Sequence, residues 1–252
     1  MSFSLYTEQN ALENIIIDED QYPIWNKILR ENIDILVNTS DKELEAEIID
    51  QESIIFHLLQ SSASVKIPVA LKSYFETILN DPSETINKPH SAFVLNISKE
   101  QAESIKNEYG VAVYSQSDIN RDFVTGGFMK ELMKNEAVSG GYPALIPQII
   151  PTSNALVITD PYLFANLEGN KNLGTENLIN LLDGFLPNTL TADYHIAIIT
   201  KNTNNRTRPH WNQLTGSIMA RIGTLREYEI VFELIVTDTI HPRRLLSNHL
   251  SG

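Results

Sequence analysis

The sequence predicts an α/β protein with two lobes, the second of which contains a parallel-type sheet flanked by helices. Three observations lead to this prediction. Apolar residues make up 42% of the 252-residue chain, which is enough for real cores. Apolar runs of strand length alternate with segments of helical periodicity. Two glycines and three prolines in "AVSGGYPALIPQIIP", residues 137–151, interrupt both patterns, so we divide the chain into residues 1–140 and 141–252.

The first lobe, residues 1–140, has the pattern of a mixed α/β domain. Its expected elements are a helix over 22–32, a strand over 33–38, and helices over 40–60 and 67–80. The clearest unit covers residues 91–115, where a strand leads into a helix and a second strand follows. Ser98 and Gln101 form a capping box at the start of that helix, and Gly110 lies where its C-cap belongs. The two strands are therefore expected to be parallel neighbours.

The second lobe, residues 141–252, alternates strands and helices more regularly. Its three strands are expected at 154–160, 194–200 and 229–238. The first is a nearly continuous apolar run, which is typical of a strand buried on both faces, and the second is also expected to be buried. Two helices are expected between them from apolar residues at helical spacing, namely Leu178, Leu181, Leu182 and Phe185 in one, and Trp211, Leu214, Ile218, Ile222 and Leu225 in the other. This alternation favours a parallel sheet.

Charge is distributed unevenly between the two lobes. The net charge is −13, which argues against general binding of nucleic acid or anionic lipid. Residues 141–252 contain eight Lys and Arg against nine Asp and Glu, whereas residues 1–140 contain eleven against twenty-three. Six of the eight arginines lie in the second lobe. Because the guanidinium group suits phosphate and carboxylate, we expect the second lobe to recognise an anion and the acidic first lobe to repel polyanions or dock a basic partner.

The composition also bears on chemistry and location. The chain has no cysteine, which excludes disulfides, thiolate zinc sites and thiol nucleophiles, and favours a reducing, cytoplasmic location. We expect no secretory signal and no membrane insertion, because the apolar runs are far shorter than a bilayer span. No cofactor and no metal site is predicted, since the histidines have no metal-ligand spacing and the acidic run 41–52 has the spacing of a solvated helix face.

Polar residues follow each strand of the second lobe. Ligands collect at the carboxyl ends of parallel strands, because the loops converge there and helix N-termini point outward. The candidates are Asp160 and Tyr162 after the first strand, Thr200, Lys201 and Asn202 after the second, and Asp238, His241, Arg243 and Arg244 after the third. Together they predict a site for a phosphate or a phosphodiester.

Each of these residues also has a purely structural interpretation. Asp160 precedes a proline, so its carboxylate can simply cap a turn. Lys201 can be a solvated loop charge, and His241 can have a structural role. His241 is nevertheless a strong candidate, because imidazole titrates near neutral pH and two arginines beside it favour an anionic ligand.

The second lobe resembles a known family over about residues 150–250. An apolar strand ending in "DPYLF", a helix, a strand ending in "IITK", a second helix and a strand running into "IHPRRLLSN" are similar to the phospholipase-D-like domain that follows MIT modules in ESCRT-associated proteins and recurs in bacterial proteins. Asp160, Pro161 and Tyr162 match the Asp-Pro-Tyr of that family. His241 and Arg243 match its His-Asp-Arg, with Pro242 in place of the acidic residue.

The resemblance implies phosphodiesterase chemistry, but this chain differs from the superfamily motif. The wider phospholipase D superfamily uses a His-x-Lys motif, in which histidine attacks phosphorus while lysine and asparagine hold the phosphate oxygens. A second histidine, from a second motif or subunit, protonates the leaving group. Here Arg243 replaces the lysine, and no other histidine is followed two positions later by a basic residue.

Two hypotheses follow. In the first, the protein is a noncatalytic or degenerate phospholipase-D-like module that recognises a phosphate-bearing ligand or a protein partner, within a multi-protein bacterial system such as phage defence. In the second, it is a homodimeric phosphodiesterase or nuclease, with nucleic acid as a substrate. Its catalytic residues would be His241 as nucleophile, Arg243 and Asn248 as phosphate holders and Asp160 as an orienting carboxylate, and its ligand contacts would come from Tyr162, Thr200, Lys201 and Arg244.

Overall fold

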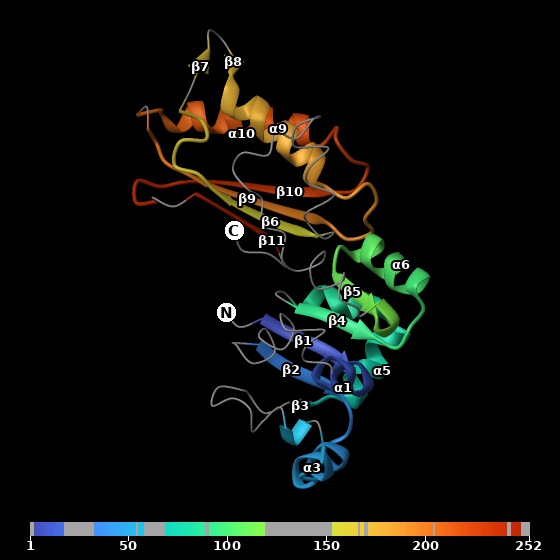
Figure 1. The fold of residues 1–252 in the computed structure, drawn as a ribbon. Coiled ribbons are helices and arrows are strands. Elements are labelled where there is room, and N and C mark those ends of the chain that lie inside the picture. The colour runs from blue at the N-terminus through green and yellow to red at the C-terminus, as the bar shows by residue number, and fades with distance from the viewer. Residues whose placement is uncertain are drawn as a thin grey trace. The chain divides into compact units, whose positions relative to one another are not determined.

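The residues that the computed structural model describes in the first half of the chain include five parallel strands in one sheet, in the order β3-β2-β1-β4-β5 (Figure 1). The described residues are 3–17, 33–53, 55–57, 69–88, 91–118, 153–165, 167–168, 171–203, 205–240 and 243–247. The chain divides into two compact units, one made of Met1–Lys106 and Val111–Glu131 and the other of Asn107–Gly110 and Leu132–Gly252.

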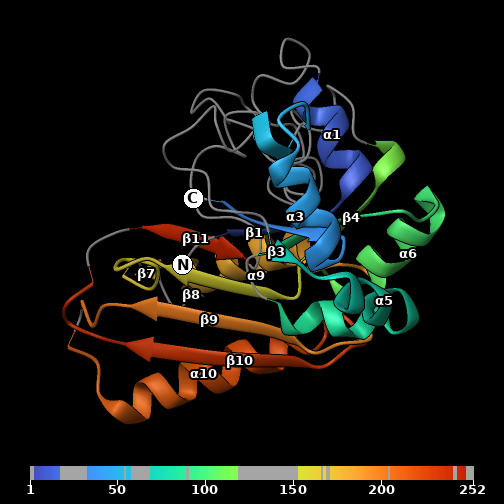
Figure 2. The same ribbon diagram turned by 90° about the horizontal axis from the view of Figure 1, so that it is seen from below.

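The first unit is doubly wound. Its elements are β1 (Phe3–Glu8), α1 (Gln9–Ile17), β2 (Ile33–Asn38), α3 (Asp41–Ile49), β3 (Val69–Ala70), α5 (Lys72–Asn80), a 3₁₀ turn η1 (Pro82–Asn87), β4 (Ser91–Leu95), α6 (Lys99–Tyr109), β5 (Ala112–Ser115) and a second turn η2 (Gln116–Asp118). From the central strand β1, the chain adds β2 and then β3 toward one edge of the sheet. It then returns to the centre with β4 and adds β5 at the other edge. Since such crossovers are right-handed, α1 and α3 lie on one face and α5 and α6 on the other (Figure 2).

The core of the first unit lies on both faces of its central strands. Leu5 of β1 is opposite Ile35 of β2 and Ala92 of β4, and all three are buried. The ring of Tyr6 stacks on that of Phe93, with centroids 4.7 Å apart. All five residues of β4 are buried, as expected for a central parallel strand.

The predicted strand, helix and strand over residues 91–115 are confirmed as β4, α6 and β5, with β4 parallel to β5. The capping box is also confirmed, because the main-chain N–H of Gln101 donates to Ser98 Oγ (3.2 Å) and that of Ser98 donates to Gln101 Oε1 (3.0 Å). Gly110 has φ of 65°, the left-handed conformation that glycine adopts without strain after a helix.

Two predicted helices of the first unit are shorter than expected. The helix over 40–60 ends as α3 at Ile49, because Asp50 is extended and its Oδ1 accepts from the main-chain N–H of Glu52, which competes with helical bonding. The helix over 67–80 begins only at Lys72, since Val69 and Ala70 pair with β2 as strand β3. No element was predicted for β1 and α1, and the predicted helix 22–32 lies outside the described residues.

The described part of the second unit contains a four-stranded sheet in the order β10-β9-β6-β11. Its elements are β6 (Ala155–Thr159), the short antiparallel pair β7 (Leu167–Glu168) and β8 (Lys171–Asn172), α9 (Leu173–Phe185), β9 (Tyr194–Thr200), α10 (Arg208–Ile222), β10 (Ile230–Val236) and β11 (Arg244–Ser247). The strands β6, β9 and β10 are parallel, and α9 and α10 cover the same face of the sheet (Figure 1).

The predicted helical stripe of α9 is confirmed, and that of α10 is confirmed up to Ile222, where the helix ends, so Leu225 lies in the turn that follows. Leu178, Leu182 and Phe185 of α9 are buried, and so are Trp211 and Ile218 of α10. They pack against apolar residues of β6 and β9 in one hydrophobic core. This core fixes the layer of helices on the sheet.

Two features of the second sheet differ from the prediction. The edge strand β11 is antiparallel to β6 (Figure 2). Its first residue, Arg244, is opposite Thr159 at the carboxyl end of β6, so β11 runs back from that edge. The strand β9, which was expected to be buried, alternates between buried and more accessible residues, with Tyr194 and Ile196 buried and His195 exposed between them. It therefore buries one face under the helices. The strand β6, for which burial on both faces was expected, also has a partly exposed residue, Val157, between buried ones. None of the helices in the described ranges is long and apolar enough to cross a membrane.

Candidate functional site

The carboxyl ends of β6, β9 and β10 meet at one edge of the second sheet. The hydroxyl of Thr200 donates to the main-chain carbonyl of Asp160 (2.9 Å), and the N–H of Asp160 donates to the carbonyl of Ile199 (3.1 Å). The N–H of Thr237, after β10, donates to the carbonyl of Thr200 (2.9 Å). The three strand ends on which the predicted site depends are thus hydrogen-bonded in a row.

Asp160 and Arg243 lie together at this edge. Asp160 Oδ1 accepts a hydrogen bond from the main-chain N–H of Tyr162 (2.8 Å) and lies 3.3 Å from Arg243 Nε. The guanidinium group of Arg243 lies over the ring of Tyr162, 5.6 Å from its centroid. The carboxylate therefore has the turn-capping role and also holds an arginine. Because the Arg243 side chain is 68% exposed, this ion pair adds little to stability, and the guanidinium group is accessible to solvent.

The other predicted site residues are placed differently. Thr200 is fully buried and its hydroxyl is used by Asp160, so Thr200 supports the edge from within and does not reach a ligand. Lys201 is half-buried at the end of β9. Arg244 is exposed and lies opposite Thr159 in the pair of β11 with β6. His241 and Asn248 lie outside the described residues.

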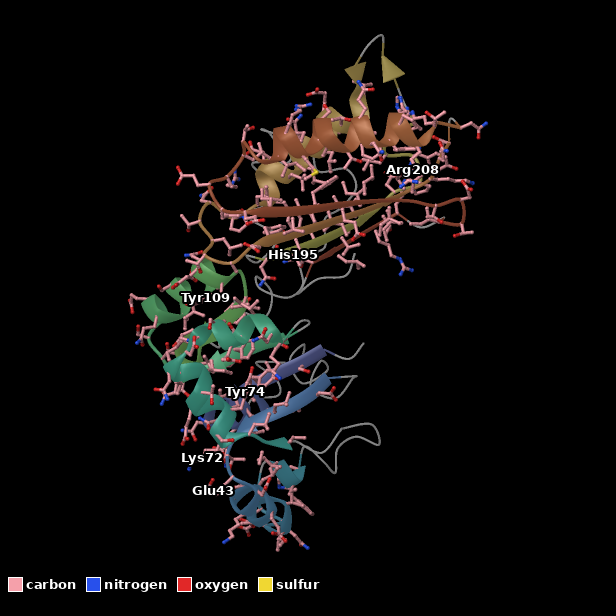
Figure 3. The ribbon with its side chains drawn as sticks, turned by 180° about the vertical axis from the view of Figure 1, so that it is seen from behind. Glu43, Lys72, Tyr74, Tyr109, His195 and Arg208 are labelled. Atoms are coloured by element: carbon pink, nitrogen blue, oxygen red, sulfur yellow. The ribbon has the colours of Figure 1, made fainter. Side chains whose placement is uncertain are left out.

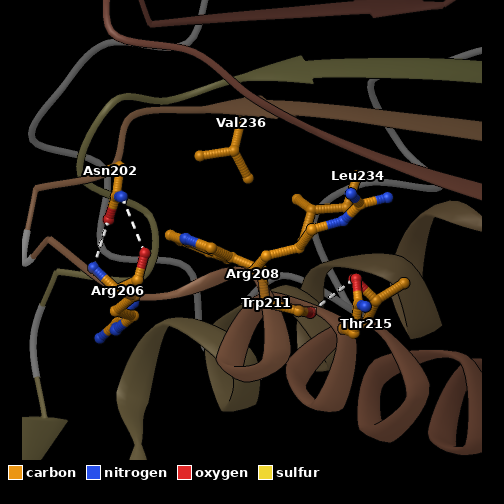
Figure 4. A pocket seen from close by; sticks show the side chains of 8 residues that line it. Asn202, Arg206, Arg208, Trp211, Thr215, Leu234 and Val236 are labelled. Atoms are coloured by element: carbon orange, nitrogen blue, oxygen red, sulfur yellow. Dashed lines mark hydrogen bonds between the residues drawn. The ribbon is translucent and has the colours of Figure 1, made fainter.

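A cavity of about 390 Å³ lies between the first turns of α10 and the carboxyl half of β10 (Figure 4). This volume is within the range of small-molecule sites. Eight side chains from β10, α10 and the loop after β9 line the cavity: Asn202, Arg206, Arg208, Trp211, Asn212, Thr215, Leu234 and Val236. Leu234 and Val236 form an apolar wall, and α10 and the loop supply the polar groups.

The loop after β9 is folded around the side chain of Asn202. Its Nδ2 donates to the carbonyl of Arg206 (3.0 Å), and its Oδ1 accepts from the main-chain N–H of Arg206 (2.8 Å). Asn205 has φ of 50°, a left-handed conformation that asparagine tolerates better than most residues. These bonds close the loop and fix the backbone from which the Arg206 side chain extends.

Two lining residues each carry a buried donor that has no acceptor within the part of the chain that the structure describes. They are Nη2 of Arg206 and Nε1 of Trp211. The Trp211 side chain is only 8% exposed, and the Arg206 guanidinium group lies 5.3 Å from the centre of its ring. Burial lowers the pKa of Arg206, but arginine remains protonated at neutral pH. A cation and an indole N–H thus share a partly buried site.

The start of α10 adds to the positive potential of the cavity. Pro209 occupies the first turn, and the N-cap residue Thr207 makes no side-chain capping bond. The N-terminus of a helix carries partial positive charge and free N–H groups. Arg208, the first residue of α10, is exposed and also lines the cavity (Figure 3). The lining residues in the described ranges include two arginines and neither Asp nor Glu.

The predicted site did not include most of these lining residues. Arg206 and Arg208 were recognised only as part of the arginine-rich second lobe, and Trp211 only as a core residue. Trp211 indeed packs in the core, and it is also among the residues that line the cavity. The available signal was the pair of arginines in the short segment between the end of β9 and Pro209, which lies in the first turn of α10.

Doubly wound sheets bind ligands where the strand order reverses. In the first unit, this point lies between the carboxyl ends of β1 and β4. This place is occupied by the side chain of Glu8. Its Oε2 accepts from Asn38 Nδ2 (2.7 Å), and its Oε1 accepts from the main-chain N–H of Asn96 (3.1 Å). The strand β1 continues directly into α1 without a glycine. Glu8 thus joins three strand ends, and the glycine-rich loop that would cradle a phosphate is missing.

Over the described ranges, no group of three or more His, Cys, Asp or Glu side chains is placed to hold a metal ion.

A comparison of the chain with models of protein families finds no match, and a comparison with curated proteins finds none either. The function must therefore be argued from the cavity and the sheet edge.

Proposed function

We propose that the second unit is a noncatalytic module that recognises a phosphate-bearing ligand in the cavity at the start of α10. The observation that carries this proposal is the lining of the cavity, which includes Arg206 and Arg208 and, within the described residues, neither Asp nor Glu. The side chains of Asn202, Asn212 and Thr215 add polar groups to this lining. Such a lining favours a ligand rich in hydrogen-bond acceptors.

The charge of the cavity favours an anion among such ligands. Arg206 and Arg208 contribute two positive charges, and the described lining residues include no Asp or Glu to oppose them. Guanidinium groups bind phosphate through charge-assisted hydrogen bonds, which are stronger than neutral ones. Asn202 uses its amide to close the loop, whereas Asn212 adds a further amide to the lining. Phosphate fits this set of donors.

The resemblance to phospholipase-D-like domains supports the same class of ligand. In this proposal the unit keeps phosphate recognition and lacks hydrolysis, because Arg243 stands where the superfamily has its lysine. The acidic first lobe then serves to dock a protein partner, within a multi-protein bacterial system. Cytoplasmic location is part of the same proposal.

Calorimetric titration of the full chain with inorganic phosphate tests the proposal. The wild-type protein is expected to bind, and Arg208→Ala is expected to bind about tenfold more weakly or worse. Arg244→Ala is the matched control, because it removes the same charge from an exposed position on β11 outside the cavity lining. No binding by the wild type, or loss in Arg244→Ala with full binding by Arg208→Ala, would overturn the proposal.

The contact of Asp160 with Arg243 favours a second candidate function. It brings the residue after Pro242 to the edge that carries Asp160, as a dimeric phosphodiesterase with His241 as nucleophile requires. Incubation with labelled single-stranded and double-stranded nucleic acid tests this function. Cleavage that His241→Ala abolishes would support it, and a strictly monomeric protein without cleavage would exclude it.

A further inference from the structure

The described lining of the cavity at the start of α10 carries two positive charges and no negative charge. Arg206 and Arg208 line it, and no carboxylate is among the residues that the structure describes there. No ion pair of either arginine is found with a described residue, in contrast to Arg221, which pairs with Glu176, and Arg226, which pairs with Asp183. Within the described residues, Arg221 and Arg226 thus have carboxylate partners, whereas none is found for the two arginines of the cavity.

We infer that the cavity selects a terminal phosphate, that is a phosphomonoester dianion, over an internal phosphodiester. This inference rests on the proposed function and names its ligand class. A phosphomonoester carries a charge of about −1.5 to −2 at pH 7, because its second pKa is about 6. A phosphodiester carries a single charge and would leave one of the two guanidinium groups uncompensated.

The donors in the cavity support the same choice. Arg206 lies in the loop before α10, Arg208 is the first residue of α10 and Asn212 lies one turn further along, and all three line the cavity. A monoester presents three terminal oxygens as acceptors for their N–H groups, whereas a diester presents only two. The donor set is thus matched to the end of a phosphorylated molecule.

Titration with methyl phosphate and dimethyl phosphate tests this selection, because the two probes differ by one methyl group and one charge. Methyl phosphate is expected to bind at about pH 7.5, and its affinity is expected to fall about tenfold by about pH 5 as the second proton binds. Dimethyl phosphate is expected to bind at least about tenfold more weakly and without this pH dependence.

An imidazole lies near the cavity. The ring of His210 is exposed and lies 6.3 Å from the ring of Trp211. A positive charge on this ring would strengthen anion binding, which is opposite in sign to the loss expected from the ligand. The variant His210→Gln removes this contribution, and the expected pH dependence of methyl phosphate binding is at least as steep in it.

The outcomes separate the inference from the proposed function. Equal affinity for both probes, with no pH dependence in His210→Gln, would overturn the selection of a monoester and leave phosphate recognition standing. Absence of binding by both probes would overturn both. Arg208→Gln gives a second check, since removal of one charge is expected to reduce binding of methyl phosphate more than that of dimethyl phosphate. A preserved ratio of the two affinities in this variant would contradict the inference.

Discussion

The hydroxyl of Thr200 donates a hydrogen bond of 2.9 Å to the main-chain carbonyl of Asp160. This bond joins the end of β9 to the turn after β6, in the edge that carries Arg243 and the loop of the cavity. Thr200 is fully buried, so water cannot replace the bond without a change in structure. The sheet edge is thus fixed from within, and the ligand-facing groups lie on its surface.

The variant Thr200→Val keeps the shape of the side chain and removes this donor. We expect a loss of about 1–2 kcal/mol in the free energy of unfolding, because the carbonyl of Asp160 loses a buried partner. Thr200→Ser keeps the hydroxyl and is expected to lose less. Urea denaturation measures both, and an equal loss in the two variants would show that the methyl group matters more than the bond.

Arg226 is expected to be the most important arginine for the stability of the second unit. Its side chain is only 13% exposed and donates to the carbonyls of Asp183, Leu186 and Pro187 at the end of α9. Arg226→Ala is expected to cost about 3 kcal/mol, because these carbonyls lose charge-assisted bonds.

Arg221→Ala is the matched control for this prediction. Its ion pair with Glu176 is 38% and 46% exposed, so its loss is expected to cost about 1 kcal/mol or less. Thermal and chemical denaturation of the two variants should therefore give clearly different midpoints. Similar midpoints would contradict the assigned role of Arg226.

Exchange of the carboxylate and the amide between Glu8 and Asn38 tests the hydrogen bond that joins these two side chains. Glu8→Gln is expected to destabilise the first unit by about 1–3 kcal/mol, because its new amide would face the amide of Asn38 that now donates to it. In the double variant with Asn38→Asp, the new glutamine can donate to the new carboxylate. We expect this double variant to recover part of the loss. A double variant as unstable as the sum of both single ones would contradict the assigned bond.

The capping box of α3 predicts a response to acid. Hydrogen bonds from the Ser40 side chain and main chain, then from Thr39, with a smaller contribution from Lys72 (Figure 3), lower the pKa of Glu43 from 4.5 to about 2. Because the folded pKa is depressed, this contribution to stability is present above pH 4.5 and is lost as the pH falls toward about 2. A carboxyl-carbon NMR titration measures it, and a Glu43 midpoint near 4.5 would contradict the capping box.

Local sequence signals predicted much of the fold. The Ser98 and Gln101 capping box and the apolar stripes of α9 and α10 depend on residues three or four positions apart, so they are visible in the sequence. The strand β3 and the direction of β11 depend on pairing with residues far away in the chain. Local periodicity contains no information on such pairing.

The candidate site was predictable only in part for the same reason. The strand ends that carry Asp160 and Arg243 were expected to meet, because parallel strands place their carboxyl ends on one edge. The cavity depends on the Asn202 side chain closing its own loop and on the placement of Trp211 both in the core and in the cavity lining. Neither orientation is encoded in residue spacing.

The indole N–H of Trp211 gives the most direct test that a phosphate oxygen binds in the cavity. The chain has two tryptophans, so the variant Trp211→Phe assigns the signal in a ¹H–¹⁵N spectrum. On titration with methyl phosphate, we expect the Trp211 signal to move saturably, with the affinity found by calorimetry, and to move far less in Arg208→Ala. Saturable calorimetric binding that leaves the Trp211 signal unmoved would contradict the account.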